Sequence, residues 1–157
     1  PVKALMLTAE YTYTYPIVYQ HNIATTTFES NDYNLGHYMR DNSTDLYVSL
    51  RYKPVRGLMV DLSWNLATHY NDYVYGSDPD IDRKPVMQDI TWQRNRLALA
   101  ARYEFLNNAY LFAGLAFDNE EGHDTDGQSA QHYLDLYSSP YFQGKTTTVN
   151  FGFNFGF

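Results

Sequence analysis

The chain has 157 residues, which fits a single domain, and it contains no cysteine, which excludes a disulfide framework and a thiolate metal site. Its formal net charge of −7 argues against a nucleic-acid partner. The mean hydropathy is −0.50, and no run of about 18 apolar residues occurs, which excludes a transmembrane helix. Aromatic residues are abundant, with 16 tyrosines, 9 phenylalanines and 2 tryptophans, and tyrosine suits both strands and membrane–water boundaries.

Six segments place apolar side chains at every second position, a period that predicts strands with one apolar face. The fifth segment is apolar on both faces, and the sixth alternates Val and Phe with Asn and Gly. No segment shows a helical period, so we expect no helix. In chain order, the predicted strands span residues 5–15, 45–53, 58–66, 96–105, 109–117 and 149–157.

The connections between these strands alternate between short and long. The turns at 53–57 and 106–109 are short, and the second contains Asn107 and Asn108, which tolerate the positive φ of a tight hairpin. The other three connections are long loops, at about 16–44, 71–90 and 118–141. Outer-membrane barrels alternate in the same way, with short turns in the periplasm and long loops outside. Aromatic residues also gather near the strand ends, as in the girdles of such barrels: Tyr13, Tyr15, Tyr52, Trp64, Tyr70, Tyr103, Phe105 and Phe157.

These features together predict an all-β fold, a transmembrane antiparallel β-barrel of a bacterial outer membrane, with the C-terminus in the periplasm. A soluble sandwich shows the same alternation, so the alternation alone does not choose between the two. Single-chain barrels begin at about 8 strands. We therefore expect residues 1–157 to form one barrel domain or the C-terminal part of a larger one.

The two faces of the predicted strands receive different environments in such a barrel. The side chains expected to contact lipid are Leu7, Val60, Leu62, Leu97, Leu99, Val149, Phe151 and Phe153. The opposite faces carry a predicted luminal charge network: Glu10, Arg51, Asp61, Arg96, Arg102 and Glu104. Because unpaired charges in a narrow lumen are costly, we expect Asp61 to pair with Arg96 or Arg102.

The terminal strand has aromatic side chains at alternating positions and ends on an aromatic residue. Phe153, Phe155 and Phe157 resemble the C-terminal signal by which the barrel assembly machinery recognises bacterial outer-membrane proteins. The alternative is that Phe157 only anchors the strand at the periplasmic interface, and both roles are compatible. The expected partners of the barrel itself are outer-membrane lipid and lipopolysaccharide.

The first long loop and its flanking strands carry a family resemblance. They read YTYTYPIVYQHN and then SNDYNLGHYMRDNSTDLYVSLRYKPVRGL. Over about residues 10–72, this resembles the Wzi-like capsule-assembly family of bacterial outer-membrane proteins. Family members are large barrels, longer than this chain, that help to hold capsular polysaccharide at the cell surface. Here His37 is followed by Tyr38, where the family often has proline. The resemblance implies a non-catalytic barrel for the assembly or attachment of surface polysaccharide.

The first loop contains apolar residues among its tyrosines, so we expect it to be ordered, to fold inward or across the barrel mouth, and to have His37 hydrogen-bonded near Asp41. Its candidate residues for binding glycan or another outer-membrane protein are Tyr19, His21, Tyr33, His37, Tyr38 and Asp41. Most acidic residues lie in the three long loops, and carboxylates are ligands for Ca²⁺. No EF-hand pattern is complete, however, and we expect neither a metal nor a cofactor.

Two other classes of function stay open. One is a structural or accessory barrel subunit of a larger outer-membrane complex, and the other is an outer-membrane barrel enzyme. Five histidines lie in or near the loops: His21, His37, His69, His123 and His132. No known spacing brings a nucleophile, a base and an orienting group together, so we expect no catalytic site.

Overall fold

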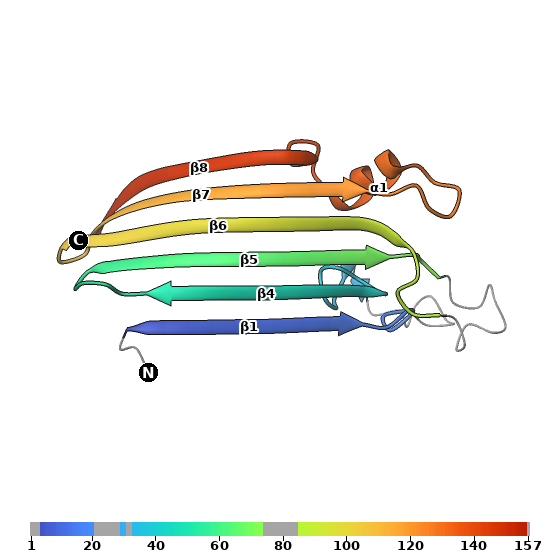
Figure 1. Ribbon diagram of the computed structural model, residues 1–157, viewed down its shortest axis with the longest axis horizontal. Coiled ribbons are helices and arrows are strands. Elements are labelled where there is room, and N and C mark those ends of the chain that lie inside the picture. Colours follow the sequence, from blue (N-terminus) through green and yellow to red (C-terminus); the bar gives the residue numbers. More distant parts are fainter. Residues whose placement is uncertain (1–3, 21–28, 31–32, 74–84, 157) are drawn as a thin grey trace.

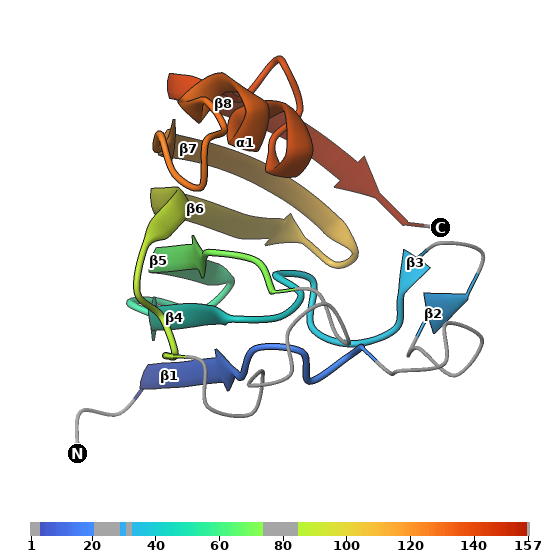
Figure 2. The ribbon, with the colours of Figure 1, turned by 90° about the vertical axis from the view of Figure 1, so that its right-hand side faces the viewer.

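The computed structural model describes residues 4–20, 29–30, 33–73 and 85–156 (Figure 1). Within these ranges the fold is all-β, with one short helix added. The elements are β1 (Leu5–Thr14), β2 (Glu29–Ser30), β3 (Tyr33–Asn34), β4 (Ser43–Tyr52), β5 (Leu58–Tyr70), β6 (Ile90–Leu106), β7 (Ala109–Gly122), α1 (Ala130–Tyr137) and β8 (Gly144–Phe155). Six strands form one antiparallel sheet in the order β1-β4-β5-β6-β7-β8, and β2 pairs with β3 in a separate hairpin. The six-stranded sheet is not closed, since β1 and β8 lie at its two edges (Figure 2).

The six predicted strands are confirmed, but most of them extend further towards the long loops than predicted. The predicted loop at 118–141 is wrong at its start, because β7 continues to Gly122. Polar residues fill these extensions, so the apolar alternation that marks a strand is missing there. The ladder continues through polar cross-strand pairs, such as Arg94 opposite Glu120. The predicted hairpin turn is confirmed, since Asn108 has a φ of 60°.

Helix α1 contradicts the expectation that the chain has no helix. It has only 8 residues, too few for a helical period to stand out in the sequence. Its N-cap is Ser129, whose side chain accepts a hydrogen bond from the backbone N–H of His132. The start of the helix lies so close to β7 that a Cβ on Gly122 would clash with the carbonyl oxygen of Ala130. Among the described residues, no helix has the length and apolar character needed to cross a membrane.

One face of the sheet is apolar across all six strands, and it is exposed. The strand register aligns Leu7, Leu50, Leu62, Leu99, Leu115 and Val149 in a single row across the sheet. All of these are exposed except Leu115, which is half-buried, and Leu7 and Val149 each reach 68% exposure. We call this surface the apolar face. All the side chains expected to contact lipid lie on it.

The opposite face, which we call the polar face, has small and hydrophilic residues in the middle of the sheet and most of the buried side chains at its loop end. One row across its middle consists of Thr8, Ser49, Ser63, Ala98, Ala116 and Thr148. The sheet curves, and α1 lies beside the loop ends of β6 and β7 (Figure 2). The buried core cluster is Met39, Ala67, Trp92 and Tyr133, with Leu134 and Tyr137 packed against it. The core of this chain therefore lies between the polar face, α1 and the first loop.

Candidate functional site

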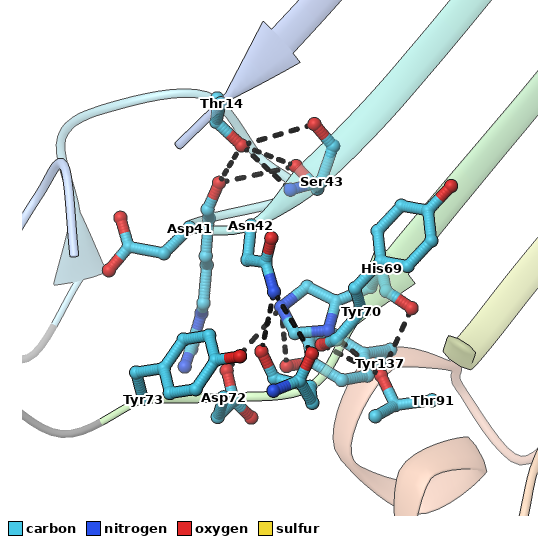
Figure 3. Close-up of polar contacts among 12 residues, drawn as sticks. Thr14, Asp41, Asn42, Ser43, His69, Tyr70, Asp72, Tyr73, Thr91 and Tyr137 are labelled. Carbon is cyan, nitrogen blue, oxygen red and sulfur yellow. Dashed lines mark hydrogen bonds and ion pairs between the residues drawn. The ribbon is translucent and has the colours of Figure 1, made fainter. Parts of the chain in front are cut away.

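Buried polar side chains tie the ends of four strands to the loops and to α1 (Figure 3). At the first of these points, the hydroxyl of Thr14 lies 2.7 Å from that of Ser43 and 2.8 Å from the carbonyl oxygen of Arg40. The backbone N–H of Ser43 also donates to the Thr14 hydroxyl at 3.0 Å. These contacts join the loop end of β1 to the start of β4, so the first loop begins and ends at one fixed place.

The second point is Asn42, which joins the first loop to the second. Its side-chain amide donates to the carbonyl oxygen of Asn71 at 2.7 Å, and its side-chain oxygen accepts from the backbone N–H of Met87 at 3.0 Å. The backbone N–H of Tyr70 donates to the carbonyl oxygen of Asn42. Asn42 has a φ of 47°, a left-handed conformation that Asn tolerates better than most residues. Its side chain therefore holds both ends of the second connection.

The third point is His69, which is fully buried and joins β5 to β6 and α1. Its Nδ1 lies 2.9 Å from the hydroxyl of Thr91, and its Nε2 lies 3.1 Å from the hydroxyl of Tyr137 (Figure 3). Because the Thr91 hydroxyl donates to the carbonyl oxygens of His69 and Tyr70, it accepts the Nδ1–H. The Nε2 of His69 then accepts a hydrogen bond from Tyr137.

The His69 side chain is uncharged at neutral pH. Burial, and to a smaller extent the positive charge of Arg40, lower the pKa of His69 to about 4. Burial raises the pKa of Tyr137, so its hydroxyl stays protonated and able to donate. The carboxylate of Asp72, whose side chain is exposed, lies 3.5 Å from the Nε2 of His69. A neutral His69 whose two ring nitrogens are occupied by hydroxyl groups holds α1 in place. We call the contacts of Asn42 and His69 the polar latch.

The structure brings together four of the six loop residues that the sequence predicts as a binding site. The hydroxyl of Tyr19 accepts from the backbone N–H of His37 at 3.0 Å, and the backbone N–H of Tyr19 donates to Asp41 at 2.9 Å. The hydroxyl of Tyr38 donates to Asp45 at 2.6 Å. The expected pairing of His37 with Asp41 is wrong, because the Nε2 of His37 faces Asp45 at 3.8 Å. The other two predicted residues lie outside the description: His21 entirely, and Tyr33 by its side chain.

The predicted luminal charges all lie on the polar face, but their pairing differs from the prediction. The Nε of Arg51 donates to Asp61, which lies directly opposite it on β5. Arg96 instead pairs with Asp118 at 3.1 Å, again its direct neighbour across the strands. Arg102 lies over the ring of Tyr110, 5.2 Å from its centroid. The expected pairing of Asp61 with Arg96 or Arg102 is therefore wrong, because the register places Arg51 directly opposite Asp61 and Asp118 directly opposite Arg96, while Arg102 lies over the Tyr110 ring instead.

Glu10 and Glu104 complete the predicted charge set, and the register places both on the polar face, opposite Tyr47 and Tyr110 respectively. Of the predicted C-terminal signal, Phe153 and Phe155 lie in β8 with exposed side chains, while Phe157 lies outside the described residues. Within the described ranges, no three histidine, aspartate or glutamate side chains are grouped as metal ligands.

The polar face also contains a recess that was not predicted from the sequence. This recess, of about 330 Å³, opens beside the end of α1. We call it the α1 recess. Its lining residues are Tyr38, Met39, Trp92, Arg94, Arg96, Glu120, Tyr137, Ser138, Ser139 and Phe142. One signal in the sequence could have indicated it. Arg94 and Arg96 are two residues apart, as are Asp118 and Glu120, so charged side chains continue the strand period of two into the predicted loop.

The chain was compared with protein-family models, with curated proteins and with solved structures. None of them matches it.

Proposed function

We propose that the six-stranded sheet is part of the wall of an outer-membrane β-barrel, with its apolar face towards lipid. The exposed apolar row across all six strands is the observation that carries this proposal. On β5, the apolar face extends from Leu58 to Leu66. At about 3.4 Å per residue this is about 27 Å along the strand, or about 21 Å at a tilt of about 40°, close to the apolar band of about 25 Å in such barrels.

Aromatic side chains support this placement in the membrane. Tyr52 and Tyr103 lie on the apolar face near the short turns, and Tyr11 and Tyr13 lie on it near the long loops. All four are exposed. Tyrosine rings at both edges of an apolar band suit the two membrane–water interfaces. In this orientation the short turns and the C-terminal end of β8 face the periplasm, and α1 and the long loops face outside.

Further strands would complete the barrel. In lipid, an unpaired sheet edge is costly because water does not satisfy its backbone groups, and β1 and β8 each have one such edge in this sheet. Six strands would also enclose too little space for the charges on the polar face and for α1. The six strands therefore belong to a larger closed wall, with the polar face lining its lumen. The pattern of Phe153, Phe155 and Phe157 suits recognition by the barrel assembly machinery.

The proposed task of this barrel is the assembly or attachment of surface polysaccharide, without catalysis. The support is the Wzi-like resemblance together with a first loop that is tied down by Asn42 and presents Tyr38 at the surface. Such a preformed surface loses little conformational freedom when it binds an extended glycan.

Two experiments test the proposal separately. The first reconstitutes the protein in bilayers containing brominated lipid, which quenches tryptophans that face the chains. Trp64 lies on the apolar face and Trp92 on the polar face, so single-tryptophan variants should show strong quenching at Trp64 and weak quenching at Trp92. Equal quenching, or quenching of Trp64 by water-soluble acrylamide instead, would refute the barrel.

The second experiment deletes the gene and measures cell-attached and released polysaccharide. We expect the attached fraction to fall and the released fraction to rise, with the total unchanged. Unchanged attachment would refute the polysaccharide role and leave only a structural barrel.

A further inference from the structure

We propose that the α1 recess binds one sugar ring of a neutral, hydroxyl-rich glycan. This inference rests on the proposed function, because it places the recess at the outer mouth of the lumen, where a glycan has access to it. The recess combines three elements that are distant in the sequence: the loop ends of β6 and β7, the first loop at Tyr38 and the segment that follows α1. Its volume of about 330 Å³ lies at the lower end of the range for small-molecule sites, about 300–1,000 Å³.

One oxygen of a buried carboxylate in the wall of the recess lacks a hydrogen-bond partner. The Glu120 side chain is only 6% exposed, and one of its oxygens lies 3.3 Å from the Nε of Arg94. The other oxygen, Oε2, is buried without a hydrogen-bond partner. A buried acceptor without a donor is destabilising, so such groups usually have a partner. A sugar hydroxyl is a donor of the required kind, and its binding would satisfy this oxygen.

The charges around the recess cancel, which selects a neutral ligand. Arg94 lies 2.8 Å from Asp118 as well as close to Glu120, and Arg96 lies 3.1 Å from Asp118. Two guanidinium groups therefore face two carboxylates, and the Asp118 side chain is only 2% exposed. A ligand with a carboxylate would compete with Asp118 and Glu120 for the same arginines. A neutral ring can accept hydrogen bonds from guanidinium N–H groups and donate to Glu120 without disturbing these pairs.

Of the four aromatic side chains that line the recess, two are exposed, and they come from different segments. Tyr38 comes from the first loop and is 61% exposed, and Phe142 follows α1 and is 47% exposed. Trp92 is buried, and its indole N–H donates to the hydroxyl of Ser138 at 2.7 Å. A sugar ring has an apolar C–H face and polar edges. Aromatic rings suit the C–H face, while Glu120 and Arg96 suit the hydroxyl groups.

Trp92 provides the readout for the test. The chain has 2 tryptophans, and Trp64→Phe leaves Trp92 as a single reporter that lines the recess. The protein, folded in detergent micelles, is titrated with neutral oligosaccharides of glucose and of mannose and, separately, with oligomers of a polyuronate. We expect a saturable change of Trp92 emission with at least one neutral series. The polyuronate should bind at least tenfold more weakly.

Matched variants separate the recess from its surroundings. Glu120→Gln should weaken binding at least tenfold, while Glu121→Gln, which changes the adjacent residue on the apolar face, should leave it unchanged. Because Glu120→Gln also breaks a buried ion pair, Phe142→Ala serves as a second test and Tyr141→Ala, at its exposed neighbour, as its control. Phe142→Ala should also weaken binding, and Tyr141→Ala should not.

The outcomes distinguish this inference from the proposed function. Each variant is also examined for heat-modifiable migration, which reports the folded barrel. A folded barrel whose Trp92 emission responds to neither neutral series, or that prefers the polyuronate, overturns the inference and leaves the barrel standing. Equal binding by the Glu120→Gln and Glu121→Gln variants overturns it as well. A protein that forms no barrel overturns both.

Discussion

The substitution Leu99→Arg tests the membrane placement most directly. Leu99 lies on β6 in the central row of the apolar face, opposite Leu62 and Leu115. On the neighbouring strand β5, two further apolar side chains lie on each side of this row. In a barrel wall this row is at the bilayer midplane, where arginine on the lipid face costs about 2–4 kcal/mol of unfolding free energy. In a water-soluble sheet the same position is 47% exposed, and the substitution would change stability by only about 0.5 kcal/mol. The two interpretations therefore differ by more than the error of the measurement.

The control for this substitution is Tyr103→Arg. Tyr103 lies on the same strand and the same face but at the edge of the apolar band, where arginine costs about 0–1 kcal/mol. Equilibrium unfolding in urea, with the protein inserted in thin phosphatidylcholine vesicles, gives the unfolding free energy of each variant. A cost below about 0.5 kcal/mol for Leu99→Arg, or a larger cost for Tyr103→Arg than for Leu99→Arg, would refute the placement.

Three further predictions concern the polar contacts. His69 lies on β5 beyond the apolar band, and its pKa is about 4 in the folded state and about 6.5 in the unfolded state. Between these two pH values only the unfolded state takes up the proton. The free energy that holds α1 against His69 should therefore fall by at most about 3 kcal/mol from pH 6.5 to pH 4. Hydrogen exchange in α1 measures this, and exchange independent of pH after correction for the intrinsic rate would contradict it. Asn42→Ala should lower the free energy of opening of both loops, measured by limited proteolysis, by about 2–4 kcal/mol. Asn42→Gly should lower it by about 1 kcal/mol less, because glycine accepts the φ of 47°. Equal losses would show that the backbone conformation does not matter. A double-mutant cycle for Arg51 and Asp61 should give a coupling of about 0.2–1 kcal/mol because both side chains are partly exposed, and complete additivity would remove that ion pair from the account.

The polar latch explains how a sheet with so little buried apolar area organises its loops. Among the described residues, the largest fully buried side chains are His69, Asn42, Thr91 and Ser43, all of them polar. Each has a partner in a different element, so the loop positions depend on hydrogen-bond geometry more than on apolar packing. Buried polar groups of this kind stabilise one arrangement when every partner is present and are costly when one is removed.

The sequence alone determined the strands and the direction in which their side chains point. A period of two is a local property, and each side chain faces opposite to its neighbour whatever the rest of the chain does. The apolar face was therefore predictable from Leu7 to Val149, and so was the tight turn at Asn107 and Asn108. The ends of the strands were not, because polar extensions such as that of β7 are held by cross-strand partners and not by apolar alternation.

Only the tertiary structure decided which residues meet. The pairs Arg51–Asp61 and Arg96–Asp118 follow from strand register, and a shift of two positions would give other partners on the same face. His69 and Tyr137 are 68 residues apart, and nothing local in either segment indicates the contact. In the sequence, Glu120 lies in a predicted acidic loop, yet in the structure it is a buried side chain beside Arg94 and α1. Burial and pairing depend on elements that are distant in the chain, and for this reason the α1 recess emerged only once the strands, the first loop and the helix were placed together.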